Sequence, residues 1–154
     1  YAFLAIISGP EPQRTLLEIQ LISSLKKRSE KALIVLGKTE KNESMVDENI
    51  TIKSHLRADE LNNAIAESDL IICRSGYSTI MDLIKMQKKA IFIPTPGQTE
   101  QEYLAKILKE KKLCLYQNQN KFNLDKAIEK SKKYSGLQQL KNYTTNWQEL
   151  FSLF

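Results

Sequence analysis

The 154-residue sequence is poor in the residues that most often hold metals and disulfides. It contains one histidine and two cysteines, and Cys73 and Cys114 lie far apart inside apolar runs. Zinc sites need clustered histidine or cysteine ligands, so we expect the protein to hold no metal. Isolated cysteines within apolar runs are typical of small core residues in a reducing compartment.

Long apolar runs are missing as well. No stretch approaches the roughly 18 apolar residues that a membrane-spanning helix requires. The opening YAFLAIIS has no basic leader and is too short for the core of a signal peptide. Because it starts without methionine and inside a strand-like run, we expect the chain to be one domain of a longer protein. The cysteine pattern and the missing leader lead us to expect a cytoplasmic location.

The net charge of +5 comes mostly from lysine, and many of these lysines lie between Lys106 and Lys141. A solvated basic face is the simplest interpretation of this segment. Attraction to an anionic membrane surface or an anionic ligand is the alternative. No RNP-like, zinc-finger or helix-turn-helix pattern accompanies the charge, so we expect no binding of nucleic acid.

Short apolar runs alternate with amphipathic helical patterns along the chain, and several runs are continuously apolar, as in strands covered on both faces. The predicted strands are Ala2–Ile7, Ala32–Leu36, Ile50–Leu56, Leu70–Cys73, Ala90–Pro94 and Leu113–Tyr116. The predicted helices are Pro12–Ser29, Ala58–Ser68, Tyr77–Gln87, Thr99–Lys112 and Leu124–Tyr134. This alternation predicts a single α/β domain over residues 1–154, built on a doubly wound parallel sheet.

Two segments fall outside the alternation. The polar stretch Lys38–Asn49 contains no continuous apolar run, and we expect it to form a surface loop. The chain ends on NWQELFSLF, residues 146–154, which reads as a last amphipathic segment.

Doubly wound sheets bind ligands at the carboxyl ends of their strands. Two familiar phosphate motifs can be tested in the loops that follow the predicted strands. Gly37-Lys38-Thr39 resembles the end of a P-loop, but the glycine required five positions earlier is replaced by Ala32. The loop SGPEPQR, residues 8–14, has only one glycine, so a dinucleotide GxGxxG fingerprint is absent.

Helix N-termini are the remaining candidates for phosphate binding, because their free N–H groups and partial positive charge favour anions. One helix is predicted to begin after Ser8-Gly9-Pro10, and another after Arg74-Ser75-Gly76. Arg14 and Arg74 could add charge-assisted contacts to a diphosphate bound there.

Polar side chains cluster at the start of the second of these helices. The hydroxyls of Ser75, Ser78 and Thr79 fit helix capping and ligand binding equally well. Asp82 lies further along the same helix, where its carboxylate could accept hydrogen bonds from both hydroxyls of a ribose. The alternative for Asp82 is an ordinary exposed helix carboxylate.

The stretch DLIICRSGYSTIMDLIKMQKKAIFIPTPGQTEQEYLA, residues 69–105, resembles the donor-binding core of family 28 glycosyltransferases. The family pattern is a strand, then C-R-[SA]-G, a threonine and a ribose-binding acid. A second strand follows, ending in proline and a loop with glutamine contacts before an aromatic residue. The resemblance is strong over residues 69–105 and weaker but collinear over residues 1–68. After about residue 118 it extends only to the architecture.

The resemblance implies a role for several residues. Asp82 corresponds to the acid that holds the ribose of UDP, although the family more often has glutamate there. The backbone of Leu56 corresponds to the uracil contact. Gln101 and Glu102 correspond to paired glutamines that bind hydroxyls of the transferred sugar. The remaining donor-binding positions lie near the diphosphate, and they are Gly9, Ser75, Gly76 and Thr79.

The resemblance also implies a Rossmann-like domain that forms the C-terminal half of a GT-B fold. Such a domain would bind the donor for transfer of an N-acetylglucosamine-like hexosyl group from a UDP-sugar to an acceptor hydroxyl, with no cofactor. The general base would lie in an N-terminal acceptor domain outside this chain, so we expect the isolated domain to be inactive. A lipid-linked acceptor and peripheral contact with the inner face of the membrane are further expectations. The alternatives are half of a UDP-sugar 2-epimerase and a non-catalytic nucleotide-binding module.

Overall fold

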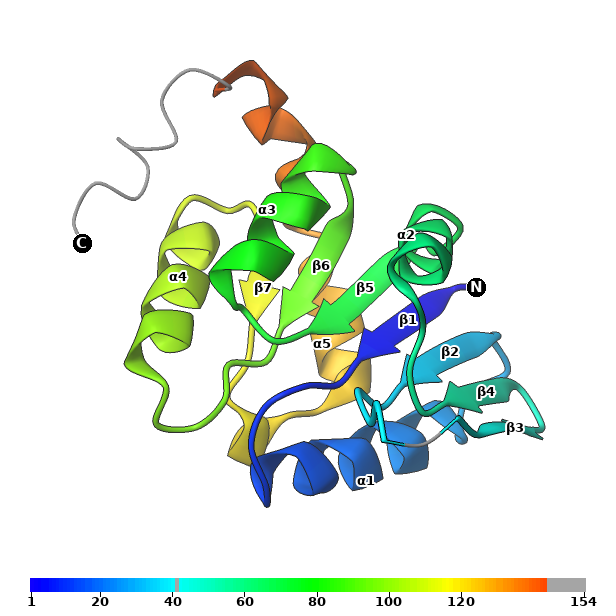
Figure 1. The fold of residues 1–154 in the computed structure, drawn as a ribbon. Coiled ribbons are helices and arrows are strands. Elements are labelled where there is room, and N and C mark those ends of the chain that lie inside the picture. Colours follow the sequence, from blue (N-terminus) through cyan, green and yellow to red (C-terminus); the bar gives the residue numbers. More distant parts are fainter. Residues whose placement is uncertain (41, 144–154) are drawn as a thin grey trace.

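The computed structural model describes residues 1–40 and 42–143, which form a seven-stranded sheet with helices on both faces (Figure 1). The strands are β1 (Phe3–Ile6), β2 (Ala32–Val35), β3 (Ser44–Asp47), β4 (Ile50–Lys53), β5 (Leu70–Cys73), β6 (Lys89–Phe92) and β7 (Leu115–Tyr116). The α-helices are α1 (Gln13–Leu25), α2 (Ala58–Ala66), α3 (Tyr77–Lys85), α4 (Thr99–Glu110) and α5 (Leu124–Ser131). Two short 3-10 helices are η1 (Gln119–Lys121) and η2 (Leu137–Tyr143).

The strand order is β3-β4-β2-β1-β5-β6-β7, and every neighbouring pair is parallel except β3 with β4. From β1 the chain runs through α1 to β2 on one side, and α2 later returns it to β5 on the other side of β1. The direction of winding therefore changes between β1 and β5, which is where doubly wound sheets open a ligand crevice. The predicted doubly wound α/β sheet is confirmed.

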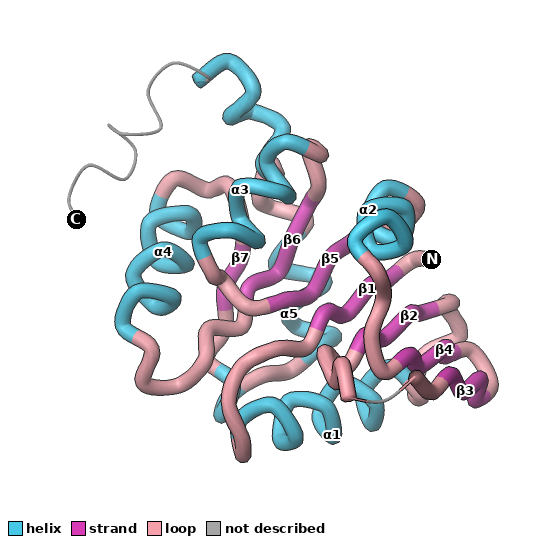
Figure 2. The backbone as a smooth tube through the Cα atoms, viewed as in Figure 1, coloured by secondary structure: helices cyan, strands magenta, loops and turns pink. Residues whose placement is uncertain are grey.

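The helices form two layers. In Figures 1 and 2, α2, α3 and α4 cover one face of the sheet, and α1 and α5 cover the other. Each layer has its own core cluster of buried aliphatic side chains. The strand β2 shows why the sheet forms, because all four of its residues, ALIV, are apolar and buried. Burial on both faces accounts for the continuous apolar runs seen in the sequence.

The prediction of a loop over Lys38–Asn49 is wrong for Ser44–Asp47, which form β3. This strand pairs antiparallel with β4 through a tight turn at Glu48 and Asn49, where Glu48 has a φ of 55°. At the edge of the sheet, β3 leaves Met45 and Val46 exposed, so its sequence carries no burial signal. The amphipathic segment 146–154 lies outside the described residues.

Both cysteines are buried and neither forms a disulfide. Cys73 ends β5 and Cys114 directly precedes β7. Burial raises the pKa of the Cys73 thiol far above its ordinary value, and it raises the pKa of Cys114 to about 12. Both side chains are therefore protonated core thiols. Within the described part of the chain, no helix has the length and apolar character needed to cross a bilayer.

Candidate functional site

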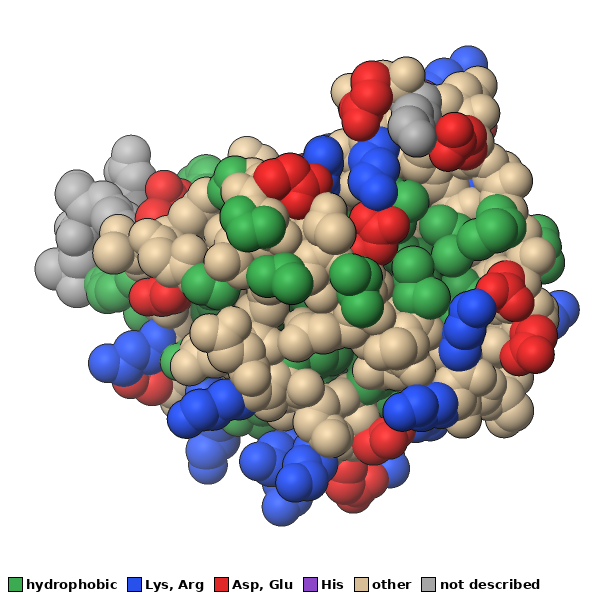
Figure 3. Space-filling view, turned by 90° about the horizontal axis from the view of Figure 1, so that it is seen from below, with side chains coloured by type: hydrophobic (Ala, Val, Ile, Leu, Met, Phe, Trp, Pro, Cys, Tyr) green, Lys and Arg blue, Asp and Glu red, His purple; other side chains and the backbone are tan. Residues whose placement is uncertain are grey.

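The carboxyl ends of β1, β5 and β6 meet at one edge of the sheet, and α1, α3 and α4 begin there (Figure 1). We call this edge the rim and define it as residues 8–14, 74–79 and 94–102. Figure 3 looks at the molecule from below, the side toward which the strand arrows of Figure 1 point. Nearly all predicted site residues lie on the rim because parallel strands deliver their following loops to one edge.

Arg74 is the buried centre of the rim, with only 2% of its surface exposed. Its Nε donates to the carbonyl of Ser8 (3.3 Å) and its Nη2 to that of Gln13 (3.1 Å). Its Nη1 donates to the carbonyls of Ile93 (2.9 Å) and Pro94 (3.2 Å). Burial lowers the pKa of Arg74 to about 10, while the carbonyl acceptors favour the charged form, so the guanidinium stays protonated near neutral pH.

These four bonds tie the loops after β1 and β6 to the end of β5. They use four of the five N–H donors of the guanidinium, which leaves one for any other partner. Arg74 therefore positions the rim from inside. The contact between Arg74 and a bound diphosphate, which the sequence suggested, stays a prediction.

A second set of bonds holds the loop between β6 and α4. The buried hydroxyl of Ser75 donates to the carbonyl of Gln101 at 2.7 Å. The side chain of Gln101 accepts from the backbone N–H of Thr95 (2.9 Å) and donates to Gln98. Glu102 is exposed and accepts from the N–H of Gly97 at 3.3 Å. The predicted sugar-binding pair thus lies on the first turn of α4, and Glu102 is the more accessible of the two.

The N-cap residue of α3 supplies no side-chain cap. This residue is Gly76, in an extended conformation, and a Cβ built on it would meet nothing within 4 Å. Ser78 is exposed and Thr79 is half-buried. The capping role that the sequence left open for these hydroxyls is therefore not seen at the N-cap. The start of α3 is open backbone with a positive dipole end, which favours an anion.

The start of α1 is different because a carboxylate already occupies it. Glu11 accepts from the backbone N–H of Thr15 at 3.2 Å and from Nε of Arg14 at 2.9 Å. Hydrogen bonds from Thr15 and then from Arg14 hold the pKa of Glu11 below its ordinary value, so this exposed group is ionised. Arg14 also donates to the carbonyl of Gly37 at 3.4 Å. Sequence reasoning missed Glu11, although its spacing of three residues from Arg14 was a signal.

Gly9 and Thr95 approach each other within the rim. Gly9 has a φ of +106°, and a Cβ at this position would lie 3.3 Å from Oγ1 of Thr95. Thr95 is 1% exposed, and its hydroxyl has no hydrogen-bond partner within residues 1–40 and 42–143. Buried polar atoms are nearly always paired, so this threonine is an unusual feature of the rim that the sequence did not indicate.

Asp82 and Leu56 lie apart from this network. On α3 the core positions are Ile80, Leu83 and Ile84, and Asp82 is exposed with no ion pair among the described residues. Leu56 is half-buried against the core on the α2–α4 side, and it lines a hollow of about 350 Å³ beyond β4. The contacts therefore bring together Gly9, Arg74, Ser75 and Gln101, but they do not join Leu56 or Asp82 to them.

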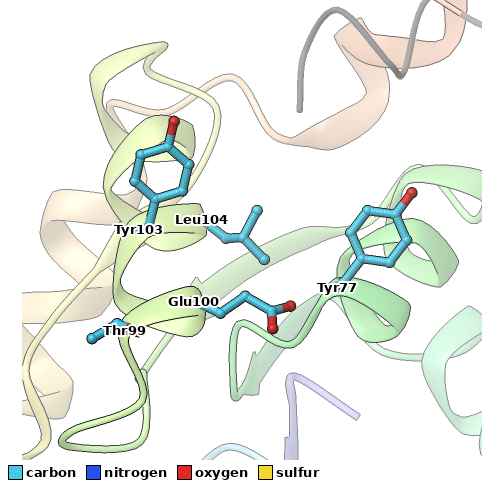
Figure 4. Close-up of a pocket in the computed structure, with 5 residues that line it drawn as sticks. All are labelled: Tyr77, Thr99, Glu100, Tyr103 and Leu104. Atoms are coloured by element: carbon cyan, nitrogen blue, oxygen red, sulfur yellow. The ribbon is translucent and has the colours of Figure 1, made fainter. Parts of the chain in front are cut away.

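A larger hollow, of about 590 Å³, opens between the starts of α3 and α4. Its lining residues are Tyr77, Thr99, Glu100, Tyr103 and Leu104. In Figure 4 the carboxylate of Glu100 points from α4 across the hollow toward Tyr77 on α3. The volume suits a small organic ligand. None of these five residues was predicted as a site residue. In the sequence, Tyr103 and Leu104 belong to the apolar stripe of a helix, so nothing there distinguishes them from core residues.

Comparison with known proteins identifies the chain's relatives. Residues 6–149 match the model of the glycosyltransferase family 28 C-terminal domain. A similar protein is the UDP-N-acetylglucosamine–N-acetylmuramyl-(pentapeptide) pyrophosphoryl-undecaprenol N-acetylglucosamine transferase of Campylobacter jejuni (strain RM1221). It is 34% identical over 92 residues, which are 58% of this chain and 26% of the relative. The transferase of the same name from Rickettsia felis is 48% identical over 56 residues, or 34% of this chain and 16% of that one.

Among solved structures, MurG from Acinetobacter baumannii has a TM-score of 0.64 at 19% sequence identity. The match covers 86% of this chain and 42% of that one. A likeness at this identity concerns the fold, and it confirms the prediction that the chain has the architecture of one half of a GT-B glycosyltransferase. The chain spans less than half the length of each of these three proteins.

Proposed function

Because the chain belongs to glycosyltransferase family 28, as its C-terminal domain, we propose that it binds the UDP-sugar donor of a hexosyltransferase. The observation that carries the proposal is the open first turn of α3, with Asp82 on the same helix. The turn suits the diphosphate, and the exposed carboxylate suits the two hydroxyls of the ribose. Leu56 would hold the base through its backbone, and Gln101 and Glu102 would bind the sugar.

In the proposed reaction the oxygen of an acceptor hydroxyl attacks the anomeric carbon of the sugar. The new C–O bond replaces the bond from that carbon to the diphosphate oxygen, and UDP leaves with the bonding electron pair. The acceptor proton passes to a general base, which we place in an N-terminal acceptor domain outside this chain. The start of α3 would stabilise the charge that grows on the departing diphosphate.

The names of the two related transferases support a finer proposal about the sugar and the acceptor. Both name UDP-N-acetylglucosamine as the donor and a pyrophosphoryl-undecaprenol, a lipid-linked group, as the acceptor. We therefore propose an N-acetylglucosamine-like donor, a lipid-linked acceptor, and a cytoplasmic enzyme in peripheral contact with the membrane.

Calorimetric titration of the chain with UDP, UDP-N-acetylglucosamine, GDP and NAD tests the proposal. We expect both uridine compounds to bind and GDP and NAD to bind far more weakly. The substitution Asp82→Asn should weaken UDP binding roughly tenfold or more, because a charged acceptor of two hydrogen bonds is lost. Glu110→Gln, which neutralises an exposed carboxylate at the far end of α4, is the matched control and should leave the affinity unchanged.

Failure of every uridine compound to bind would overturn the proposal. Binding of UDP that Asp82→Asn and Glu110→Gln leave equally strong would remove Asp82 from the site. That second result would favour the alternative of a nucleotide-binding module with a different arrangement of contacts.

A further inference from the structure

The charge of the chain is concentrated in one segment. Residues 106–133 contain nine lysines and three acidic residues, a net charge of +6. The rest of the chain holds 14 basic and 15 acidic residues, so it is nearly neutral. All nine lysines of the segment are exposed. The positive charge of the protein therefore belongs almost entirely to this part of its surface.

The fold places this segment along one edge of the sheet. The strand β7 is the last in the strand order, α4 packs beside it on one face and α5 on the other. The ends of the two helices are joined, because Ser135 and Gly136 donate to the carbonyls of Lys112 (3.0 Å) and Leu113 (2.9 Å). We call the surface of residues 106–133 the β7 edge.

The three acids of the β7 edge do not neutralise it. Glu110 lies 3.9 Å from Lys106, and Glu129 forms a 2.7 Å ion pair with Lys132. Asp125 is paired with Arg28, which lies outside the segment. Seven lysines of the segment have no ion pair among residues 1–40 and 42–143, and these are Lys109, Lys111, Lys112, Lys121, Lys126, Lys130 and Lys133.

The local needs of the helices explain only part of this pattern. A lysine in the last turn stabilises a helix through its dipole, and Lys109 and Lys130 occupy such positions. The other seven lysines of the segment are not explained by the helix dipole. The opposite edge has no such excess, since residues 42–53, which include β3 and β4, carry Glu43, Asp47 and Glu48 against Lys53, and Asp47 pairs with Lys26. The excess of positive charge therefore lies at one edge of the sheet.

We propose that the β7 edge docks on an anionic lipid bilayer. All nine basic residues are lysines, whose compact, mobile charges suit a diffuse layer of anionic headgroups. Nucleic-acid surfaces more often use the planar fork of arginine and exposed aromatic rings for stacking. The aromatic residues of the segment, Tyr116 and Phe122, are both partly buried, and Lys109 covers the ring of Tyr116 at 5.2 Å.

Docking through the β7 edge would also place the rim where a membrane-bound acceptor can reach it. This step rests on the proposed lipid-linked acceptor. The β7 edge and the rim are adjacent sides of the sheet, one along the last strand and one across the strand ends. A domain that docks through its β7 edge holds the rim at a right angle to the bilayer. A lipid-linked acceptor could then reach the rim from the side while its tail stays in the membrane.

Co-sedimentation of the chain with vesicles tests the proposal. We expect binding to vesicles of phosphatidylcholine with about one third phosphatidylglycerol, no binding to pure phosphatidylcholine, and loss of binding at high salt. The variant Lys111→Gln/Lys112→Gln/Lys130→Gln/Lys133→Gln should bind the anionic vesicles at least roughly tenfold more weakly. The matched control is Lys27→Gln/Lys31→Gln/Lys85→Gln/Lys89→Gln, which removes four exposed lysines elsewhere and should keep most of the binding.

Several outcomes would overturn the proposal: no binding to anionic vesicles, equal binding to neutral ones, or an equal loss in both variants. Tighter binding to a short RNA or DNA duplex than to the vesicles would also overturn it. Titration of the β7-edge variant with UDP separates this proposal from the previous one. The variant should bind UDP as the unsubstituted chain does, whatever the vesicles show.

Discussion

Two helices begin at the same rim, yet their first turns are filled in opposite ways. The start of α1 holds the carboxylate of Glu11, which accepts from the N–H of Thr15 and from Arg14. The start of α3 has glycine at its N-cap, a residue with no side chain that could cap the turn. Both turns have the same dipole and the same kind of backbone donors, so only the neighbouring side chains distinguish them.

This difference indicates at which helix start an anionic ligand binds more favourably. At α3 the N-cap residue is a glycine, which has no side chain to place against the first turn. At α1 a diphosphate would have to displace or approach an ionised carboxylate. Sequence reasoning offered the two helix starts as equals, and the structure favours α3. Three substitutions test this difference between the helix starts: one removes Arg74, which supports both, one adds a carboxylate to α3, and one neutralises the carboxylate at α1.

The largest effect is expected from Arg74, which supports both helix starts from beneath. Arg74→Met leaves the carbonyls of Ser8, Gln13, Ile93 and Pro94 without this donor, and those of Ile93 and Pro94 belong to buried residues. Each unpaired buried acceptor costs about 1–3 kcal/mol, so the free energy of unfolding should fall by at least about 2 kcal/mol. Urea denaturation followed by circular dichroism measures the loss.

The conservative variant Arg74→Lys serves as the control. Lysine keeps the charge but lacks the planar fork of donors, so it should restore only part of the stability that methionine loses. If Arg74→Met and Arg74→Lys both unfold at the urea concentration of the unsubstituted chain, the guanidinium does not hold the rim together.

Arg74 also shows where prediction from sequence stops. The motif RSG placed it at the end of a strand beside a helix start, and that placement is confirmed. Its partners are four backbone carbonyls from loops 19 to 66 residues away, and backbone acceptors leave no trace in sequence. Asp82 was offered either as a ribose ligand or as an exposed helix carboxylate, and its exposure agrees with both, because Ile80, Leu83 and Ile84 form the buried face of α3. The strand β3 was missed because its apolar side chains are exposed.

An intermediate effect is expected when the open start of α3 is given its own carboxylate. Ser78→Glu places a negative charge in the first turn, much as Glu11 does at α1. The dipole should stabilise the new carboxylate, and a bound diphosphate should be repelled by it. We expect UDP to bind roughly tenfold more weakly by calorimetry, with the thermal midpoint unchanged or slightly raised. Ser78→Gln has the same shape without the charge and should bind UDP normally; equal weakening in both would show that bulk matters instead.

The smallest effect is expected from the reverse substitution at α1. Glu11→Gln keeps the shape of the side chain and an acceptor oxygen for the N–H of Thr15, but it removes one negative charge from the rim and loosens the pair with Arg14. UDP should then bind about two- to fivefold more tightly at low salt, the usual scale for one exposed charge near a helix start. The gain should vanish at high salt because exposed charges are screened there. Weaker binding of UDP to Glu11→Gln would mean that Glu11 assists the ligand, and α1 would then join α3 as part of the anion site.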